Sequence, residues 1–180
     1  MNFELLETQH LILRKLTPET YNYIFQEYND NELKAFLGFT TDEELDKEKD
    51  KLRKGIATYN RSFVNFQLID KQTNAIMGAC GYHTWYTEHH RAEIGYALNN
   101  DIHKGKGIMS EALKAVIDYG FREMDLNRIE ALIGPKNEAS LRLVQKLNFT
   151  KEGHLRKHYF KNNNMEDSLV FSLLRDEYLH

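Results

Sequence analysis

Apolar residues recur at helical spacing in several stretches of the chain. The longest predicts a helix from about Gly107 to Phe121, and a shorter helix is predicted over Glu138–Leu147. Another helix is predicted to begin at Thr17 and Pro18, because threonine caps helix starts and proline suits the first turn. The apolar face of the longest helix would consist of Ile108, Ala112, Leu113, Val116, Ile117 and Gly120. Such a face indicates a helix that packs on a core.

The segment Thr41–Ile56 combines helical periodicity with a high density of charge. Leu45, Leu52 and Ile56 fall on one helical face, whereas most other residues of the segment are acidic or basic. This pattern predicts a solvent-exposed surface helix, with a charged recognition element as the alternative.

Alternating and continuous apolar runs predict about seven strands. They are Leu11–Lys15, Phe63–Ile69, Ala75–Tyr86, Ala92–Leu98, Arg128–Ile133, Thr150–Phe160 and Asp167–Leu174. A polar turn, Lys161–Asn164, would join the last two strands. Because strands and helices interleave, we expect a mixed α/β sheet with its helices outside. No linker-like composition divides the chain, so a single domain over residues 1–180 is expected.

The composition is that of an ordinary globular protein. With 180 residues, of which 41% are hydrophobic and 28% charged, the chain can bury a core without disulfides or metals. The net charge of −3 provides no basic field for nucleic acid, so no direct nucleic-acid partner is expected. A lone cysteine, no apolar run of membrane-spanning length and no signal peptide predict a cytoplasmic protein without a membrane partner.

Neither the cysteine nor the histidines indicate chemistry of their own. Cys80 lies in an apolar predicted strand, which favours a small core residue over an acyl-carrying nucleophile. The histidines show no metal-ligand spacing, so no metal is expected.

A candidate phosphate site lies where a strand and a polar loop lead into Gly105-Lys106-Gly107 at the start of the longest helix. The first amides of a helix have no internal partner, and glycines let a phosphate approach them closely. His103, Lys104 and Lys106 add positive charge there. The spacing matches neither a Walker loop nor a dinucleotide-binding fingerprint, and glycines that merely start a helix are the alternative.

Several short motifs form a specific set when they are taken in order along the chain. They are Leu6-Glu7-Thr8 with Leu11-Ile12-Leu13-Arg14, Ile94-Gly95-Tyr96, Lys104-Gly105-Lys106-Gly107 with Ser110-Glu111-Ala112, Asn137-x-x-Ser140, Lys146-Leu147-Asn148-Phe149 and Tyr159-Phe160. With this set the chain resembles, over nearly its whole length, the GNAT family of acetyl-CoA-dependent N-acetyltransferases, and within it the ribosomal-protein-alanine N-acetyltransferase (RimJ/RimL-like) branch.

Three positions depart from the pattern of that family. Ile102 stands where Gln or Arg is usual, Asn148 where Gly is usual, and Gln9-His10 where an acidic–basic pair is usual. The first departure removes one side-chain contact to a pyrophosphate, so backbone contacts would dominate there.

The resemblance implies the GNAT fold, with a splay between the fourth and fifth predicted strands, and acetyl-CoA as co-substrate. The splayed backbone from Ile94 to Leu98 would pair with the amides of the pantetheine arm and donate to the acetyl carbonyl. The residues implied to bind acetyl-CoA are Ile94, Gly95, Tyr96, Ala97, Leu98, His103, Lys104, Gly105, Lys106, Gly107, Ile108, Met109, Asn137, Ser140, Leu143 and Lys146.

In this family a primary amine attacks the thioester directly, and the resemblance implies Glu93 and Ser140 as catalytic residues. Glu93 would accept the proton of the amine through water; the alternative is a structural carboxylate paired with Arg91 or Arg128. Ser140 would protonate or orient the departing thiolate; the alternative is an ordinary polar residue in the first turn of a helix.

The acceptor groove is expected to take its side chains from an aromatic-rich stretch and from a later tyrosine. The candidates are Tyr82, His83, Trp85, His90 and Tyr159, with core packing or interface burial as the alternative. A protein N-terminal α-amine is the first expectation, because its pKa of about 7.7–8.0 demands less of a base than the value of about 10.4 for a lysine.

A small polyamine or aminoglycoside amine is the second expectation for the acceptor. A non-catalytic acyl-CoA-binding or regulatory module and a nucleotide-binding protein of another kind are the alternatives to an enzyme. A homodimer is expected only from the resemblance to the family.

Overall fold

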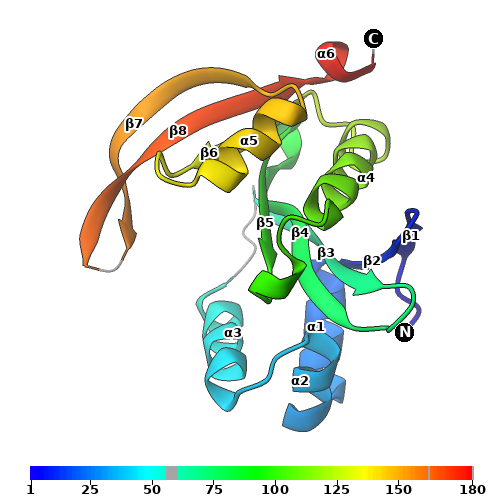
Figure 1. Ribbon diagram of the computed structural model, residues 1–180. Coiled ribbons are helices and arrows are strands. Elements are labelled where there is room, and N and C mark those ends of the chain that lie inside the picture. Colours follow the sequence, from blue (N-terminus) through cyan, green and yellow to red (C-terminus); the bar gives the residue numbers. More distant parts are fainter. Residues whose placement is uncertain (56–60, 162, 180) are drawn as a thin grey trace.

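The computed structural model describes residues 1–55, 61–161 and 163–179. The described strands form one mixed sheet in the order β1-β2-β3-β4-β5-β6-β8-β7 (Figure 1). They are β1 (Leu5–Glu7), β2 (Leu11–Leu16), β3 (Ser62–Asp70), β4 (Ile76–Tyr86), β5 (Arg91–Leu98), β6 (Arg128–Ile133), β7 (Thr150–Lys161) and β8 (Asn164–Leu174). The helices are α1 (Pro18–Glu27), α2 (Asp30–Leu37), α3 (Asp42–Lys54), α4 (Ile108–Arg122), α5 (Glu138–Lys146) and α6 (Arg175–Leu179).

The mixed α/β sheet with helices around it confirms the predicted fold class. Every predicted strand is present, and the sheet has eight described strands rather than about seven because β1 was not predicted. β1 is only three residues long and therefore shows no alternation, but it pairs with β2. Ile56 of the predicted surface helix and Asn162 of the predicted turn lie outside the described residues.

The sheet opens between β5 and β6, its one described parallel pair. These strands pair only over Arg91–Glu93 and Arg128–Glu130 and then diverge. Beyond Glu93, β5 remains bonded to β4, and beyond Glu130, β6 remains bonded to β8. This break lies where the resemblance to the GNAT family implied it, between the fourth and fifth predicted strands. Figure 1 shows the long β7–β8 hairpin reaching away from the rest of the molecule on the β6 side of the break.

Helix α4 supplies the apolar face that the sequence predicted. Leu113, Val116 and Ile117 are almost fully buried in the main core, where α4 packs against β4. Tyr82 of β4 is also fully buried, and its hydroxyl donates to the backbone oxygen of Val116 at 2.8 Å. A Cβ on Gly120 would lie 2.2 Å from that hydroxyl oxygen, so only glycine fits there. Tyr82 is therefore a core residue. This position matches the alternative of core packing and not the expected place in an acceptor groove.

A second core lies under α1, α2 and α3, which gather beside the β2–β4 part of the sheet (Figure 1). Its buried residues are Leu16, Tyr21, Ile24, Leu33, Leu37, Leu45 and Phe63. Helix α3 contributes only Leu45 as a buried residue, which confirms the surface helix predicted there. Thr17 and Thr41 cap α1 and α3 with their side chains, each in a capping box.

Candidate active site

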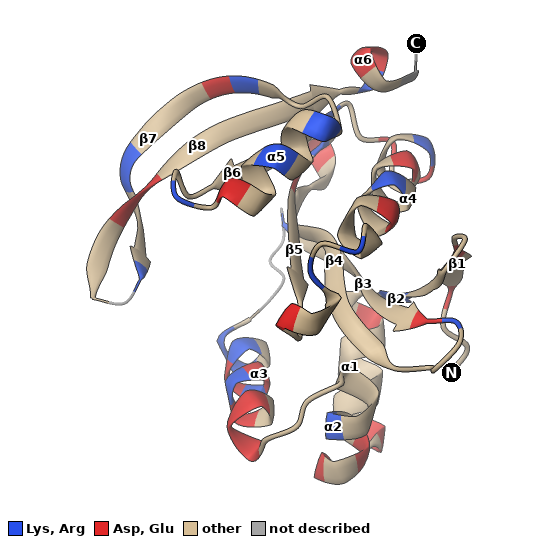
Figure 2. Cartoon of the chain, in the orientation of Figure 1, with Lys and Arg blue, Asp and Glu red and all other residues tan. Residues whose placement is uncertain are grey.

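The loop before α4 holds two glycines in conformations that other residues rarely adopt. Gly105 has φ 75° and Gly107 has φ 80°, both in the left-handed region. A Cβ at either position would meet no atom within 4 Å, so open space lies over the loop. Gly107 caps α4 without a side-chain hydrogen bond, which leaves the first amides of the helix for an outside acceptor. Basic residues flank this space on the same loop (Figure 2).

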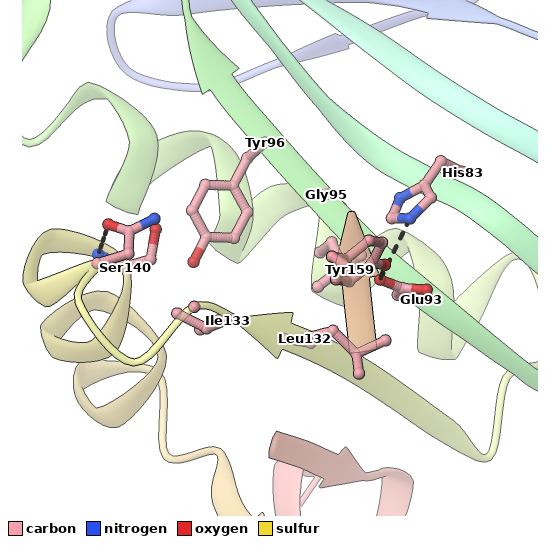
Figure 3. A pocket seen from close by; sticks show the side chains of 12 residues that line it. His83, Glu93, Gly95, Tyr96, Leu132, Ile133, Ser140 and Tyr159 are labelled. Atoms are coloured by element: carbon pink, nitrogen blue, oxygen red, sulfur yellow. Dashed lines mark hydrogen bonds and ion pairs between the residues drawn. The ribbon is translucent and has the colours of Figure 1, made fainter. Parts of the chain in front are cut away.

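A cavity of about 260 Å³ lies where β5 and β6 diverge. Residues of β5, of β6 and the loop after it, and of the start of α5 surround it, and His83 and Tyr159 complete it from β4 and β7. The lining residues are His83, Glu93, Ile94, Gly95, Tyr96, Ala131, Leu132, Ile133, Gly134, Asn137, Ser140 and Tyr159. Figure 3 shows that charged and polar groups gather at its two ends.

Glu93, His83 and Tyr159 form one end of the cavity (Figure 3). The Nε2 atom of His83 lies 3.3 Å from Oε1 of Glu93, and the hydroxyl of Tyr159 donates to the same oxygen at 3.5 Å. The Glu93 side chain is only 15% exposed. Burial and the Glu93 charge raise the pKa of the Tyr159 hydroxyl, so it stays protonated and able to donate.

The ion pairs that the sequence allowed for Glu93 are not formed. Arg91 pairs instead with Glu130 at 3.0 Å, and Arg128 pairs with Glu130 at 2.7 Å and Glu152 at 2.8 Å. Glu93 therefore faces the cavity without an arginine partner among the described residues.

Tyr96 and Ser140 form the other end of the cavity (Figure 3). Asn137 caps α5 by accepting from the Ser140 amide at 3.2 Å, which fixes the first turn of the helix. The Tyr96 hydroxyl oxygen is buried and has no hydrogen-bond partner of acceptable geometry within the described residues. Burial raises the pKa of Tyr96, and the nearby Ser140 side chain acts in the opposite direction. A buried hydroxyl without a partner is costly and indicates a missing ligand group.

The comparison with known proteins identifies the family. A family model described as an acetyltransferase (GNAT) domain matches residues 10–150. The chain belongs to the GNAT acetyltransferases. An uncharacterized N-acetyltransferase, p20, from Bacillus licheniformis is 36% identical over 176 residues, which are 97% of this chain and 98% of that protein. The crystal structure of a GNAT-family acetyltransferase from Bacillus anthracis superimposes with a TM-score of 0.68 at 27% identity, covering 97% of this chain and all of that one.

Two shorter matches carry more specific names. A putative ribosomal N-acetyltransferase, YdaF, from Bacillus subtilis is 31% identical over 104 residues, which are 58% of this chain and 56% of that protein. Spermidine N(1)-acetyltransferase from Escherichia coli K12 is 29% identical over 91 residues, 51% of this chain and 48% of that protein. This acetyltransferase therefore resembles enzymes named for two different acceptors.

The described residues fit acetyl-CoA in this acetyltransferase. The open glycine loop suits a pyrophosphate, and the split between β5 and β6 leaves room for an extended arm beside Ile94–Leu98. The unpartnered Tyr96 hydroxyl offers a donor where the arm would end. Of the residues predicted to bind acetyl-CoA, five line the cavity and two lie in the open loop before α4. They are Ile94, Gly95, Tyr96, Asn137 and Ser140 in the cavity and Gly105 and Gly107 in the loop.

Some predicted residues have surroundings that limit their part in the site. Met109 is 9% exposed in the main core, and Leu143 packs against that core. Lys104 makes an ion pair with Asp101 at 2.6 Å. Of the acceptor candidates, Trp85 packs against the core, and His90 lies near Asp125, away from the cavity.

The sequence did not single out the β6 side of the cavity. Leu132, Ile133 and Gly134 line it, together with Ala131. In sequence they belong to an ordinary apolar strand and the turn after it, and only the divergence of β6 from β5 exposes them to the cavity. The Ile94-Gly95-Tyr96 motif pointed to Tyr96, but nothing in the sequence revealed that its hydroxyl lacks a hydrogen-bond partner among the described residues.

None of the described helices is long and apolar enough to cross a membrane. No group of three or more His, Cys, Asp or Glu residues in the described ranges is arranged to hold a metal ion.

Proposed function

We propose that this acetyltransferase moves the acetyl group of acetyl-CoA to a primary amine in the cavity between β5 and β6, with a protein N-terminal α-amine as the favoured acceptor. The observation that carries the proposal is the separation of two polar ends in one cavity. Glu93 stands at one end to draw a proton, and Tyr96 and Ser140 stand at the other end with hydroxyls to donate.

Acetyl-CoA supplies the activated acetyl group, and the chain supplies its binding and the proton transfers. The amides around Gly105 and Gly107 and the start of α4 would hold the pyrophosphate. The β5 backbone from Ile94 to Leu98 would pair with the pantetheine amides and direct an N–H at the acetyl oxygen. Tyr96 and Ser140 would donate toward the sulfur, which favours departure of the thiolate.

Glu93 would accept the proton of the incoming ammonium through a bound water. Its small exposure keeps the carboxylate away from bulk solvent. An α-amine, with a pKa of about 7.7–8.0, is already partly neutral at physiological pH, whereas a lysine at about 10.4 is not. The described residues of the cavity include no strong base. An α-amine, whose pKa is lower than that of a lysine, therefore suits the cavity better than a lysine does.

A polyamine is the second candidate acceptor. It is supported by the similarity to the spermidine acetyltransferase, which covers about half of each chain. A ribosomal protein as the acceptor is supported in the same way by the similarity to YdaF.

The test combines binding with thiol release. CoA at one hundred times its dissociation constant should stabilise the protein by about 2.7 kcal/mol, whereas ATP and NAD should not. Free thiol is then followed with acetyl-CoA and a panel of N-terminal peptides, polyamines and aminoglycosides. No thermal shift with CoA would overturn the proposal, and a shift without thiol release from any amine would favour a non-catalytic acyl-CoA-binding module.

A further inference from the structure

His83 occupies a β-bulge in β4. The pairing of β4 with β5 moves from Tyr82–Ile94 to Thr84–Glu93, which leaves His83 as an extra residue without a place in the register. The pairing of β4 with β3 shifts at the same point. Bulges of this kind bend a strand and redirect a side chain, often beside an active site. Here the bulge brings the imidazole to the cavity wall.

The two nitrogens of the His83 ring meet different surroundings. Nε2 faces the Glu93 carboxylate at 3.3 Å, whereas Nδ1 lies over the backbone of Gly95. A Cβ on Gly95 would come within 2.7 Å of Nδ1, so this glycine makes the room for the ring. A carboxylate beside Nε2 favours the tautomer with the proton on Nε2 and leaves the Nδ1 lone pair free.

The charged and titratable groups around the ring come from two elements besides β4. Glu93 of β5 lies against Nε2, and Tyr159 of β7 donates to the same carboxylate oxygen. Behind Tyr159 the ring of His158 contacts the tyrosine ring, with centroids 4.6 Å apart. The His83 side chain is 45% exposed, which gives it a direct route to solvent. Glu93 is thus the one carboxylate among the described residues of the cavity.

We propose that His83 is the immediate proton acceptor for the amine and takes the place that the proposed function gives to a water molecule. Glu93 orients the ring of His83 and stabilises its protonated form. The proposal rests on the proposed function. Imidazole is the side chain that most often serves as a general base near neutral pH, so it suits the removal of a proton from an ammonium. The adjacent carboxylate stabilises the imidazolium that forms.

The proton and electron balance is complete with the groups named. One N–H bond of the ammonium breaks, and its proton moves to Nδ1 of His83 and then to solvent. The amine nitrogen uses the freed electron pair to form the C–N bond at the acetyl carbon, while the C–S bond breaks with its electron pair on sulfur. The thiolate takes a proton from the hydroxyl end of the cavity, and that hydroxyl regains a proton from solvent. The second N–H proton of the attacking nitrogen is lost to solvent.

The first experiment compares wild type, His83→Asn and the matched control His89→Asn, an exposed histidine of the neighbouring turn that does not line the cavity. Thiol release is measured from pH 5.5 to 9. His83→Asn should lower kcat about 100-fold and remove the acidic limb of the pH profile, and added imidazole should restore part of the rate. His89→Asn should match wild type. The loss should be smaller for a less basic amine, which needs less help to become neutral.

The second experiment determines which ring nitrogen of His83 carries the proton, in the absence of turnover. Nitrogen-15 NMR of the histidine rings in the protein without acetyl-CoA, with His83 assigned by difference from His83→Asn, should show the proton on Nε2. Glu93→Gln should weaken that preference. A His83 ring protonated on Nδ1 would contradict the proposal, because no free electron pair would then face Gly95.

The outcomes separate this inference from the function on which it rests. If wild type releases thiol and His83→Asn retains its rate, or loses rate with an unchanged acidic limb and no imidazole rescue, His83 only positions Glu93 and the inference fails alone. If wild type releases no thiol with any amine, both fail. A thermal shift with CoA confirms that each variant is folded, and His83→Gln replaces His83→Asn if the latter shows none.

Discussion

The paired and the open parts of the β5–β6 junction differ in how they treat polar groups. Where the strands pair, Arg91, Arg128, Glu130 and Glu152 are joined in ion pairs of 2.7–3.0 Å. Where the strands diverge, the Tyr96 hydroxyl has no partner within the described residues, and Glu93 is approached only at 3.3 and 3.5 Å. The paired part holds the two halves of the sheet together, and the open part keeps its polar groups available for a ligand.

Glu93 stands at the boundary of these two parts, and its loss should have the largest effect. Glu93→Gln keeps the shape of the side chain but removes the negative charge, so kcat should fall about 100-fold or more, most severely at low pH. Steady-state thiol release across pH measures this. Glu88→Gln, on the exposed turn before β5, is the control. Equal turnover of Glu93→Gln and wild type at every pH would remove Glu93 from the mechanism.

Substitutions at the hydroxyl end of the open part should lower the activity but not the stability of the protein. Tyr96→Phe and Ser140→Ala should each lower kcat about 10-fold with little change in CoA affinity. Because the Tyr96 hydroxyl has no partner, Tyr96→Phe should leave the free energy of unfolding unchanged or raise it by up to about 1 kcal/mol. Tyr86→Phe, which keeps its ring over Arg91, serves as the control. A loss of CoA affinity without loss of kcat would make these residues binding groups only.

The paired part should show the reverse behaviour. Glu130→Ala removes the carboxylate that joins Arg91 and Arg128 and should lower the free energy of unfolding by about 1–2 kcal/mol, measured by urea denaturation. The pH dependence of kcat should keep its shape, because Glu130 does not line the cavity. A changed pH profile with unchanged stability would contradict the division between the two parts.

The smallest effect is expected at the outer edge of the paired part. Arg128 and Ser172 lower the pKa of Glu152 to about 2, so the ionised form is the one that the fold stabilises. Its contribution is therefore present at neutral pH and is lost as pH falls from about 4.5 toward 2. Since Glu152 is 41% exposed, Glu152→Gln should cost less than about 1 kcal/mol at pH 7 and progressively less as the pH falls toward 2. Paired urea titrations at the two pH values check this.

Local patterns made much of the fold predictable. The apolar stripe of α4, the proline and threonine at the start of α1 and the alternation in the strands are each encoded within a few neighbouring residues. The glycines before α4 are of the same kind, because their positive φ angles are a local requirement. The short strand β1 escaped prediction because it depends on its pairing with β2 rather than on a pattern of its own.

The site was predictable only in part, because its geometry depends on pairing between distant strands. Tyr82 and His83 are neighbours in an aromatic-rich stretch, yet one lies in the core and the other lines the cavity, at a point where β4 carries an extra residue. A one-residue change of register moves a side chain to the other face of a sheet, and nothing within the stretch specifies where that change occurs.

The sequence alone determined the fold class and the glycine loop before α4, since these follow from short-range periodicity and backbone conformation. The position of the break in the sheet was implied only by the resemblance to the GNAT family. The tertiary structure decided that Glu93 meets His83 and Tyr159 instead of an arginine, and that the Tyr96 hydroxyl is left without a partner. These relations join residues up to 66 positions apart. They depend on register, divergence and burial, which arise only when the strands pair.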